Sequence, residues 1–183
     1  QLKSHIDELI IVVGYKKDMI IDYLGTEYMG IRIRYIEQKE QLGTGHALLT
    51  CQELINDEKF IVMSGDDFYS SKDIEKVMKI SSNDGICMLA SKVKNPWDYG
   101  VLEIQDGKLV KIHEKQKNPV SDLVNISLYI LPKNIFSILQ DLPKSERGEI
   151  ELTDAVSLLA LQKNQQTKIR IHIVEDYWWP VTY

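Results

Sequence analysis

Residues 33–52 read IRYIEQKEQLGTGHALLTCQ and change character twice. An alternating, strand-like run ends near the polar residues Gln38 and Gln41, a step of glycine, threonine and glycine follows at residues 43–45, and an apolar helical pattern begins at Ala47. The stretch therefore predicts a strand that turns directly into a helix. Two glycines around a threonine need a physical reason at such a junction.

Strand and helix patterns alternate along the first half of the chain. The run ELIIVVG is apolar, which suits a central strand buried on both faces, whereas GIRIRYIEQ alternates as a half-buried strand. This succession predicts a Rossmann-like α/β fold, a mostly parallel sheet with helices on both faces. The strand patterns lie at residues 8–14, 30–38, 59–69 and 85–93, and the helical patterns at residues 16–25, 44–55 and 71–82.

The second half of the chain adds an antiparallel segment to this core. Residues 99–115 alternate on either side of Asp106-Gly107, a dipeptide that tolerates the positive φ angles of a tight hairpin turn. We expect a single domain over residues 1–183, with an antiparallel insertion at residues 97–130. The remaining patterns predict a strand at residues 124–131, a helix from Pro132 to about Leu139, a helix at residues 151–164 and a strand at residues 168–174.

Composition limits the classes of partner. The net charge of −5 argues against nucleic-acid binding and leaves small anionic ligands open. Cys51 and Cys87 lie far apart in apolar runs, which favours buried free thiols and a reducing, cytoplasmic setting. The sequence shows neither a membrane span nor a signal peptide. It also has no initiator Met, which suggests that it begins inside a longer protein.

The glycine step at residues 43–45 has two interpretations. In the first, Thr44 caps the helix and the glycines satisfy local geometry. In the second, Gly43 and Gly45 let the main chain approach a flat or anionic ligand, while Gln38 or Gln41 offers a donor and an acceptor to a base edge. The step is neither a P-loop nor a dinucleotide-binding fingerprint, because it lacks both glycine patterns.

A pair of carboxylates follows the apolar run FIVMSG. A strand that ends here delivers Asp66 to the carboxyl edge of the sheet, where open α/β folds bind ligands. Asp66 is our candidate for holding Mg²⁺ against phosphate oxygens, since hard cations prefer carboxylate oxygen. Asp67 is interpreted as a turn or N-cap residue ahead of the next helix.

Polar residues also gather at the strand ends of the insertion. Each of them taken alone fits a solvated surface residue, but their shared position favours a ligand site in which carboxylate and amide groups bond hydroxyls and a lysine meets phosphate. His46 and His113 receive no catalytic role, because neither has metal-ligand spacing to a partner. The residues of this set are Tyr99, Gly100, Glu114, Lys115 and Asn125.

Several segments together resemble the sugar-1-phosphate nucleotidylyltransferases. The resemblance covers nearly the whole chain and is strongest to the N-acetylglucosamine-1-phosphate uridylyltransferase and glucose-1-phosphate thymidylyltransferase branches. The segments, in order, are VVGYKKDMIIDYLG, EQKEQLGTGHALL, VMSGDDFY, YGVLEIQDGKLVKIHEK, VNISLYI and GEIELTDAV.

The resemblance implies a reaction between UTP or dTTP and a sugar 1-phosphate, which yields a nucleoside diphosphate-sugar and pyrophosphate. Gln38, Gly43 and Thr44 would then bind the base, and Asp66 would be a catalytic Mg²⁺ ligand. The insertion would bind the sugar through Tyr99, Gly100, Glu114 and Asn125, with Lys115 as a catalytic cation. Positioning and neutralised charge would suffice for this reaction, which needs no protein nucleophile.

Three features depart from the family's pattern. Family members open with a glycine-rich, Arg-containing loop and a Lys-containing segment, and nothing of that kind precedes Gln1. We therefore expect the chain to enter the fold at about its second strand, and a true fragment of this kind to be inactive. Ser127 stands where the N-x-G pattern has glycine, so the sequence does not fix the identity of the sugar. Pro180 stands where a second metal-binding residue is usual, and nearby Asp176 is not assigned that role.

Two hypotheses of different classes follow. The first is a Mg²⁺-dependent nucleotidylyltransferase, for which a homo-oligomer is compatible; the second is a non-catalytic, nucleotide-sugar-binding regulatory or assembly paralogue. UTP and dTTP both remain candidates, because their bases present nearly the same polar edge. We interpret Trp178 and Trp179 as core residues rather than as an interface with a C-terminal continuation such as an acyltransferase domain.

Overall fold

The computed structural model describes residues 6–162 and 169–181. The chain divides into two compact units, one formed by residues 1–56 with 139–152 and the other by residues 57–138 with 153–183. The single domain over residues 1–183, with its insertion at residues 97–130, stays a prediction.

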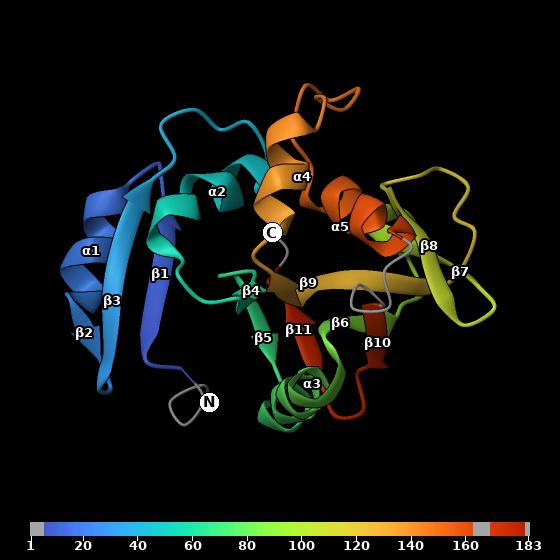
Figure 1. Ribbon diagram of the computed structural model, residues 1–183, viewed down its shortest axis with the longest axis horizontal. Coiled ribbons are helices and arrows are strands. Elements are labelled where there is room, and N and C mark those ends of the chain that lie inside the picture. The colour runs from blue at the N-terminus through green and yellow to red at the C-terminus, as the bar shows by residue number, and fades with distance from the viewer. Residues whose placement is uncertain (1–5, 163–168, 182–183) are drawn as a thin grey trace. The chain divides into compact units, whose positions relative to one another are not determined.

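The first unit contains a small mixed sheet. Its strand order is β1-β3-β2, with β1 parallel and β2 antiparallel to β3, and Figure 1 shows α1 beside these strands. The predicted junction is present, because β3 ends at Glu37 and α2 begins at Thr44. The elements are β1 (Glu8–Val13), α1 (Lys17–Leu24), β2 (Glu27–Tyr28), β3 (Ile31–Glu37), α2 (Thr44–Thr50) and the 3₁₀ turn η1 (Gln52–Leu54).

The second unit is built on a six-stranded sheet. Its order is β10-β6-β9-β7-β8, with β4 paired to β9 as well. A separate two-stranded ribbon pairs β5 with β11. The elements are β4 (Lys59–Met63), β5 (Asp67–Tyr69), α3 (Ser71–Asp84), β6 (Ile86–Lys92), the 3₁₀ turn η2 (Pro96–Asp98), β7 (Gly100–Gln105), β8 (Lys108–Glu114), β9 (Leu123–Pro132), α4 (Ile135–Asp141), α5 (Leu152–Leu161), β10 (Ile169–Ile173) and β11 (Trp178–Pro180).

The α/β class is confirmed, and the sheet is mixed rather than mostly parallel. β10 is parallel to β6, but β9 runs antiparallel to β4, β6 and β7. β4, β6 and β10 therefore share one direction, as an α/β core requires, and β9 enters among them with the opposite direction. The sequence pattern missed this, because strand direction depends on how a connection folds back and not on the strand's own residues.

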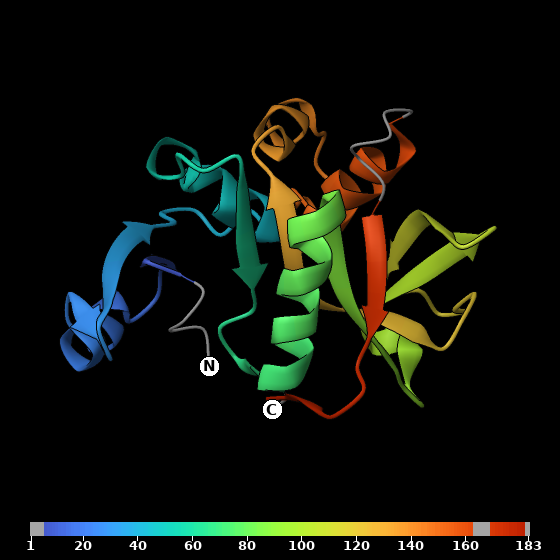
Figure 2. The same cartoon turned by 60° about the horizontal axis from the view of Figure 1, so that its bottom comes forward.

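Helices lie on both sides of the second unit's sheet. Figures 1 and 2 show α3 on one side and α5 on the other. α3 buries a stripe at helical spacing that includes Ile74 and Val77, which are 1 % and 0 % exposed. β6 and β9 are buried along most of their length, so they form the core. Each large apolar side chain that is fully buried contributes roughly 1.5–3 kcal/mol.

Local signals at turns are confirmed. The hairpin of β7 and β8 turns at Asp106 and Gly107, whose φ angles of 50° and 70° match the two-residue turn expected for this dipeptide. α1 ends at Gly25, which has a φ of 66° and donates its N–H to the carbonyl of Ile21. Cys51 and Cys87 are buried free thiols, as predicted.

Two local expectations are wrong. The apolar run at residues 8–14 forms β1, but β1 lies at one end of the first unit's described strand order and only its last residue, Val13, is buried. An apolar run reports burial potential and not the number of neighbouring strands. Pro132 ends β9 opposite Lys59 instead of opening a helix, and α4 begins at Ile135.

Some predictions fall partly on residues that the structure does not describe. Residues 163 and 164 of the predicted helix and residue 168 of the predicted last strand lie outside the described ranges. Within residues 6–162 and 169–181, no helix combines the length and apolar character needed to cross a membrane.

A bulge interrupts β9 at Ser127. Met88 pairs with Tyr129 and Ala90 with Asn125, so three residues of β9 lie opposite one residue of β6. Ser127 has a φ of 55°, which is a left-handed conformation that favours glycine. This conformation gives a physical reason for glycine in the N-x-G pattern at this position.

A buried carboxylate ties α3 to the segment between β10 and β11. Asp73 is fully buried and accepts hydrogen bonds from His172 Nε2 at 2.9 Å and from the backbone amides of Glu175 and Asp176 at 3.1 and 3.2 Å. Burial acts to raise the pKa of Asp73, but the bond from His172 and the two amide bonds outweigh it and hold the pKa below its usual value. The ionised form of Asp73 is thus part of the folded structure.

We expect Ser127→Gly to stabilise the protein by about 1 kcal/mol, because relief of the left-handed strain exceeds the added entropy of the unfolded glycine. Urea unfolding monitored by circular dichroism measures this change. Ser127→Ala is the matched control, since it removes the hydroxyl but keeps the strain, and it should leave stability within about 0.5 kcal/mol of wild type. Equal stabilisation by both variants would contradict the strain argument.

We expect Asp73→Asn to destabilise the protein by about 2 kcal/mol near pH 7, because an amide places a donor against the donors that the carboxylate accepts. Since the folded pKa of Asp73 is lowered, its contribution is present above about pH 4 and is lost as the pH falls through the folded value. The difference in unfolding free energy between wild type and variant should therefore shrink from about pH 7 to about pH 3. Asp57→Asn, at an exposed carboxylate, is the control and should show no such trend.

Candidate functional site

The glycine step of the first unit packs tightly against residues 149–152. Gly45 N donates to the carbonyl of Ile150 at 2.8 Å, and Ile150 N donates to the carbonyl of Leu42 at 2.7 Å. A Cβ added to Gly43 would lie 2.7 Å from the Ile150 oxygen, and one added to Gly45 would lie 2.8 Å from it. Gly43 also has a φ of 100°. Both glycines are therefore required by close backbone packing.

Thr44 does not cap its own helix. Gly43 occupies the N-cap position of α2, and no side-chain bond is formed there. Thr44 Oγ1 instead accepts the backbone N–H of Leu152 at 3.2 Å, at the first residue of α5. The capping interpretation is thus wrong for α2, since the hydroxyl satisfies one of the open N–H groups at the start of another helix.

Gln38 closes the turn from the strand side. Its Nε2 donates to the carbonyl of Gly43 at 3.1 Å and lies 2.9 Å from His46 Nδ1. With both amide hydrogens committed, Oε1 is the atom of this side chain that is left to accept a bond from a ligand. His46, at the start of α2, thus makes a local hydrogen bond with Gln38.

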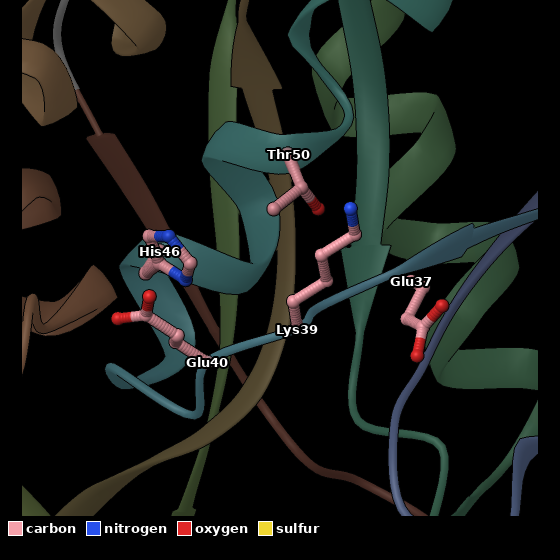
Figure 3. Close-up of a pocket in the computed structure, with 5 residues that line it drawn as sticks. All are labelled: Glu37, Lys39, Glu40, His46 and Thr50. Atoms are coloured by element: carbon pink, nitrogen blue, oxygen red, sulfur yellow. The ribbon is translucent and has the colours of Figure 1, made fainter.

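A shallow pocket of about 300 Å³ lies beside this turn in the first unit. Figure 3 shows the Lys39 amine directed toward Thr50 and the Glu40 carboxylate directed toward His46. Glu37, which also lines the pocket, is paired with Lys17 at 2.6 Å. The pocket wall is therefore polar, and His46 connects it to Gln38.

Asp66 lies in the exposed loop that follows β4 in the second unit. Ser64 Oγ donates to Asp66 Oδ1, and the backbone N–H of Ser64 donates to the carbonyl of Ser127 at 3.0 Å. The loop is thereby attached to β9, and its carboxylate remains accessible to a ligand.

Asp67 has a different role from the one predicted. It begins β5, whereas Ser70 holds the N-cap position of α3, so the prediction of a turn or N-cap residue is wrong. Its Oδ2 accepts the indole N–H of Trp178 at 3.1 Å. Burial raises the pKa of Asp67. The hydrogen bond from Trp178 lowers this pKa, whereas the neighbouring charge of Asp66 raises it further.

Gly100 and Glu114 form a cross-strand pair of β7 and β8. A Cβ on Gly100 would lie 2.9 Å from Ile112 Cγ2 and 3.0 Å from Glu114 Oε2, so the Glu114 carboxylate lies over the glycine. Thr153 Oγ1 donates to the same Oε2 at 3.3 Å. Glycine is needed here to make room for the carboxylate.

Asn125 follows Val124, the residue of β9 that pairs with Val101 of β7. Its side chain is buried, and its Oδ1 accepts the backbone N–H of Ser127 at 3.1 Å. Burial raises the pKa of Tyr129. A hydrogen bond from Asn125 lowers this pKa, whereas the charge of Glu114 raises it further.

Tyr99 and Lys115 flank this group. The Lys115 N–H donates to the Tyr99 carbonyl at 3.0 Å, and Lys115 has a φ of 44° with an exposed side chain. The Tyr99 ring meets Trp178 edge to face, with centroids 5.6 Å apart. The structure thus places Gly100, Glu114 and Asn125 on the neighbouring strands β7, β8 and β9, with Tyr99 directly before β7 and Lys115 directly after β8.

Among the described residues, no group of three or more histidine, cysteine, aspartate or glutamate side chains is arranged to hold a metal ion. Mg²⁺ usually retains waters and binds through one or two carboxylates together with substrate phosphates. The accessible carboxylate of Asp66 fits that donor set.

With this geometry in place, comparison with known proteins identifies the family. A family model described as nucleotidyl transferase matches residues 1–179. The chain belongs to the nucleotidyl transferase family. It is 38 % identical over 181 residues to a bifunctional protein GlmU of Methanococcus maripaludis, which covers 97 % of this chain and 41 % of that protein. It is 36 % identical over 172 residues to the UTP–glucose-1-phosphate uridylyltransferase AglF of Haloferax volcanii, which covers 90 % of this chain and 69 % of that protein.

Two solved structures share the fold. A candidate glucose-1-phosphate thymidylyltransferase from Bacillus anthracis, in complex with sucrose, has a TM-score of 0.84 at 26 % identity and covers 98 % of this chain and 73 % of that one. A UDP-glucose pyrophosphorylase with UDP-glucose has a TM-score of 0.81 at 24 % identity, with 94 % and 75 % covered, and shows the likeness in fold alone. The chain spans about two fifths of the length of the GlmU relative, 41 %.

Pro180 lies just beyond the region that the family model matches, and the view that it stands in place of a second metal-binding residue stays a prediction. Pro180 lies opposite Asp67 in the ribbon of β5 and β11 and has no side-chain donor atom for a metal. Asp176 accepts the Ser70 hydroxyl at 2.9 Å. Trp178 is half-buried, but Trp179 is 63 % exposed, so the interpretation of both tryptophans as core is wrong for Trp179.

Sequence reasoning missed two supporting interactions. One is the bond between Asp67 and Trp178, for which the alternation of inward and outward residues in two short aromatic segments was the available signal. The other lies in the first unit, where Arg147 Nη2 and Ser145 Oγ donate to Glu151 Oε1 at 2.7 and 3.1 Å. No local signal announced it, because residues 145–151 lie in the loop before α5, where a spacing of four residues does not bring side chains together.

We expect Gly45→Ala to destabilise the protein by about 2 kcal/mol, because its Cβ would meet the Ile150 carbonyl and Leu139 Cδ2 at under 3 Å. Urea unfolding measures the change. Gly65→Ala is the matched control, since a Cβ there meets nothing within 4 Å, and it should change stability by less than about 0.5 kcal/mol. A Gly45→Ala protein as stable as this control would show that the packing is not tight.

Proposed function

We propose that the protein transfers a nucleotidyl group from UTP or dTTP to a sugar 1-phosphate, with Mg²⁺, and releases a nucleoside diphosphate-sugar and pyrophosphate. The observation that carries the proposal is the pairing of Gly100 with Glu114, in a chain of the nucleotidyl transferase family. A carboxylate lying over a glycine and held by Thr153 presents acceptor oxygens to sugar hydroxyls. The buried amide of Asn125 adds a donor beside it.

The nucleotide base is assigned to the turn of the first unit. Gln38 Oε1 would accept the N3–H of a uracil or thymine, because its Nε2 is already bonded to Gly43 and His46. Gly43 and Thr44 would contribute main-chain groups in a conformation that their packing against residues 149–152 holds in advance. The names of relatives, among them a uridylyltransferase, support a pyrimidine base.

Charge is the main requirement of the reaction. Asp66, exposed and anchored by Ser64, would hold Mg²⁺, which supplies neutralising charge to phosphate oxygens when it is bound. Lys115, exposed at the end of β8, would meet a phosphate as a point charge.

The reaction is a direct displacement. A phosphate oxygen of the sugar 1-phosphate forms a bond to the α-phosphorus of the triphosphate, and the bond from that phosphorus to the bridging oxygen of pyrophosphate breaks. The electron pair leaves with pyrophosphate, so no protein nucleophile is needed. The residues of this chain hold the two substrates and compensate charge. The two free, buried cysteines favour a reducing compartment, and we place the reaction in the cytoplasm.

A second candidate is a non-catalytic paralogue that binds a nucleotide-sugar. Pro180 favours it, because the position opposite Asp67 offers no second metal ligand. The two candidates differ in turnover: an enzyme releases pyrophosphate, whereas the paralogue binds UDP-glucose without release.

The test is pyrophosphate release by the full-length protein with UTP or dTTP, Mg²⁺ and a panel of sugar 1-phosphates. We expect Asp66→Asn to lower kcat by at least about 100-fold while the thermal midpoint stays within about 3 °C of wild type, since Asp66 is exposed. Asp57→Asn, at another exposed carboxylate, should keep wild-type kcat. Release by wild type that resists EDTA, or an active Asp66→Asn protein, would refute the metal assignment. Absence of pyrophosphate release with every pair of substrates would refute the enzymatic function.

A further inference from the structure

We propose that Asp67 is a positioning residue which, through Trp178, sets the orientation of Tyr99 on the sugar side of the site. The inference rests on the proposed function, because Tyr99 is assigned to the sugar there. Asp67 itself touches neither the sugar nor the reacting phosphates in this proposal. It acts through one hydrogen bond and one aromatic contact.

The first link joins Asp67 to Trp178. These residues lie on the paired strands β5 and β11, and the Trp178 indole N–H donates to Asp67 Oδ2 at 3.1 Å. An indole has a single N–H donor, so this bond fixes which way the ring lies about its side-chain torsions. A half-buried indole that lost its acceptor would also leave a polar group poorly satisfied.

The second link joins Trp178 to Tyr99. Their rings meet at an interplanar angle of 68° with centroids 5.6 Å apart, an edge-to-face contact. Such a contact depends on the orientation of both rings, because the positive edge of one must meet the negative face of the other. A rotated Trp178 ring would therefore release Tyr99.

A third interaction fixes the whole ribbon. The Tyr69 hydroxyl, which lies 3.2 Å from Asp67 Oδ2, donates to the carbonyl of Ile126 at 2.8 Å. Ile126 is next to Asn125 in β9, so β5 is attached to the strand that carries the buried amide. Asp67 is thus connected to β9, which carries Asn125, and through Trp178 to Tyr99, which directly precedes β7.

The neighbouring residues of the ribbon offer controls. Phe68 and Trp179 form the adjacent cross-strand pair and are 61 % and 63 % exposed. Trp179 stacks on Tyr177 with centroids 4.7 Å apart. Strand alternation therefore places Trp178 inward and Trp179 outward, and only the inward residue is part of the proposed connection.

Steady-state kinetics of the full-length protein, with glucose 1-phosphate and UTP each varied in turn, test the proposal. We expect Asp67→Ala and Trp178→Phe each to raise the KM for glucose 1-phosphate about tenfold. The KM for UTP and kcat should stay within about twofold of wild type. Asp67→Asn keeps an acceptor for the indole and should restore a KM within about twofold of wild type, although it removes the same charge as Asp67→Ala.

Two further variants sharpen the result. The double variant Asp67→Ala/Trp178→Phe should be no worse than either single variant, because both break the same connection. Trp179→Phe should leave every kinetic constant unchanged. The proposal is overturned if Asp67→Asn behaves like Asp67→Ala, since charge near Asp66 would then be the cause, or if Trp178→Phe leaves the KM for glucose 1-phosphate unchanged.

A spectroscopic readout separates this inference from the proposed function. The indole N–H resonance of Trp178, assigned by its loss in Trp178→Phe, should shift in Asp67→Ala and much less in Asp67→Asn. Titration with glucose 1-phosphate, followed by this resonance, should give a weaker Kd for Asp67→Ala than for Asp67→Asn. If the Kd is weaker for Asp67→Ala than for Asp67→Asn but the protein shows no turnover, the enzymatic function is refuted and the positioning role is kept. Equal Kd values for the two variants, or no binding of glucose 1-phosphate to wild type, would overturn the positioning role.

Discussion

The bulge at Ser127 in β9 is the constraint from which the second unit's site is built. A regular strand would direct the backbone groups of residues 126 and 127 into its ladder, but the bulge releases them. The backbone N–H of Ser127 donates to Asn125 Oδ1, and the carbonyl of Ser127 accepts the backbone N–H of Ser64. The carbonyl of Ile126 accepts the Tyr69 hydroxyl. The Asp66 loop, β5 and the buried amide of Asn125 are therefore all held by one irregular turn of β9. Its cost is a left-handed backbone at a residue other than glycine.

In the first unit, close packing and binding are assigned to the same residues. Gly43 and Gly45 are small because Ile150 lies against them, and Thr44 points its hydroxyl to Leu152. Packing holds the turn rigid, and a rigid turn is what a base-binding site needs in order to avoid an ordering cost on binding. The two interpretations of the glycine step therefore do not exclude one another: the packing is observed, and the binding is proposed.

Local features were predicted from the sequence where one short segment contains the whole signal. The Asp106-Gly107 turn and the end of the helix of residues 16–25 are of this kind. Predictions failed where the outcome depends on a distant partner. The sequence predicts a central strand at β1, but β1 has a single described neighbour. It predicts a turn residue at Asp67, but Asp67 bonds to Trp178, more than a hundred residues later. It predicts a core residue at Trp179, but Trp179 lies on the outward face of a ribbon.

The sequence by itself determined the α/β class, the hairpin and the family. It also determined the set of residues proposed for the base, the metal and the sugar, because side-chain chemistry and short-range periodicity are properties of the sequence itself. Tertiary structure alone decided that β9 runs antiparallel to β4, β6 and β7, that the Glu114 carboxylate lies over Gly100, and that Asp67 accepts the indole N–H of Trp178. These facts depend on which segments meet in space. Pairing of distant strands is set by the packing of the whole core and not by any residue's own preference.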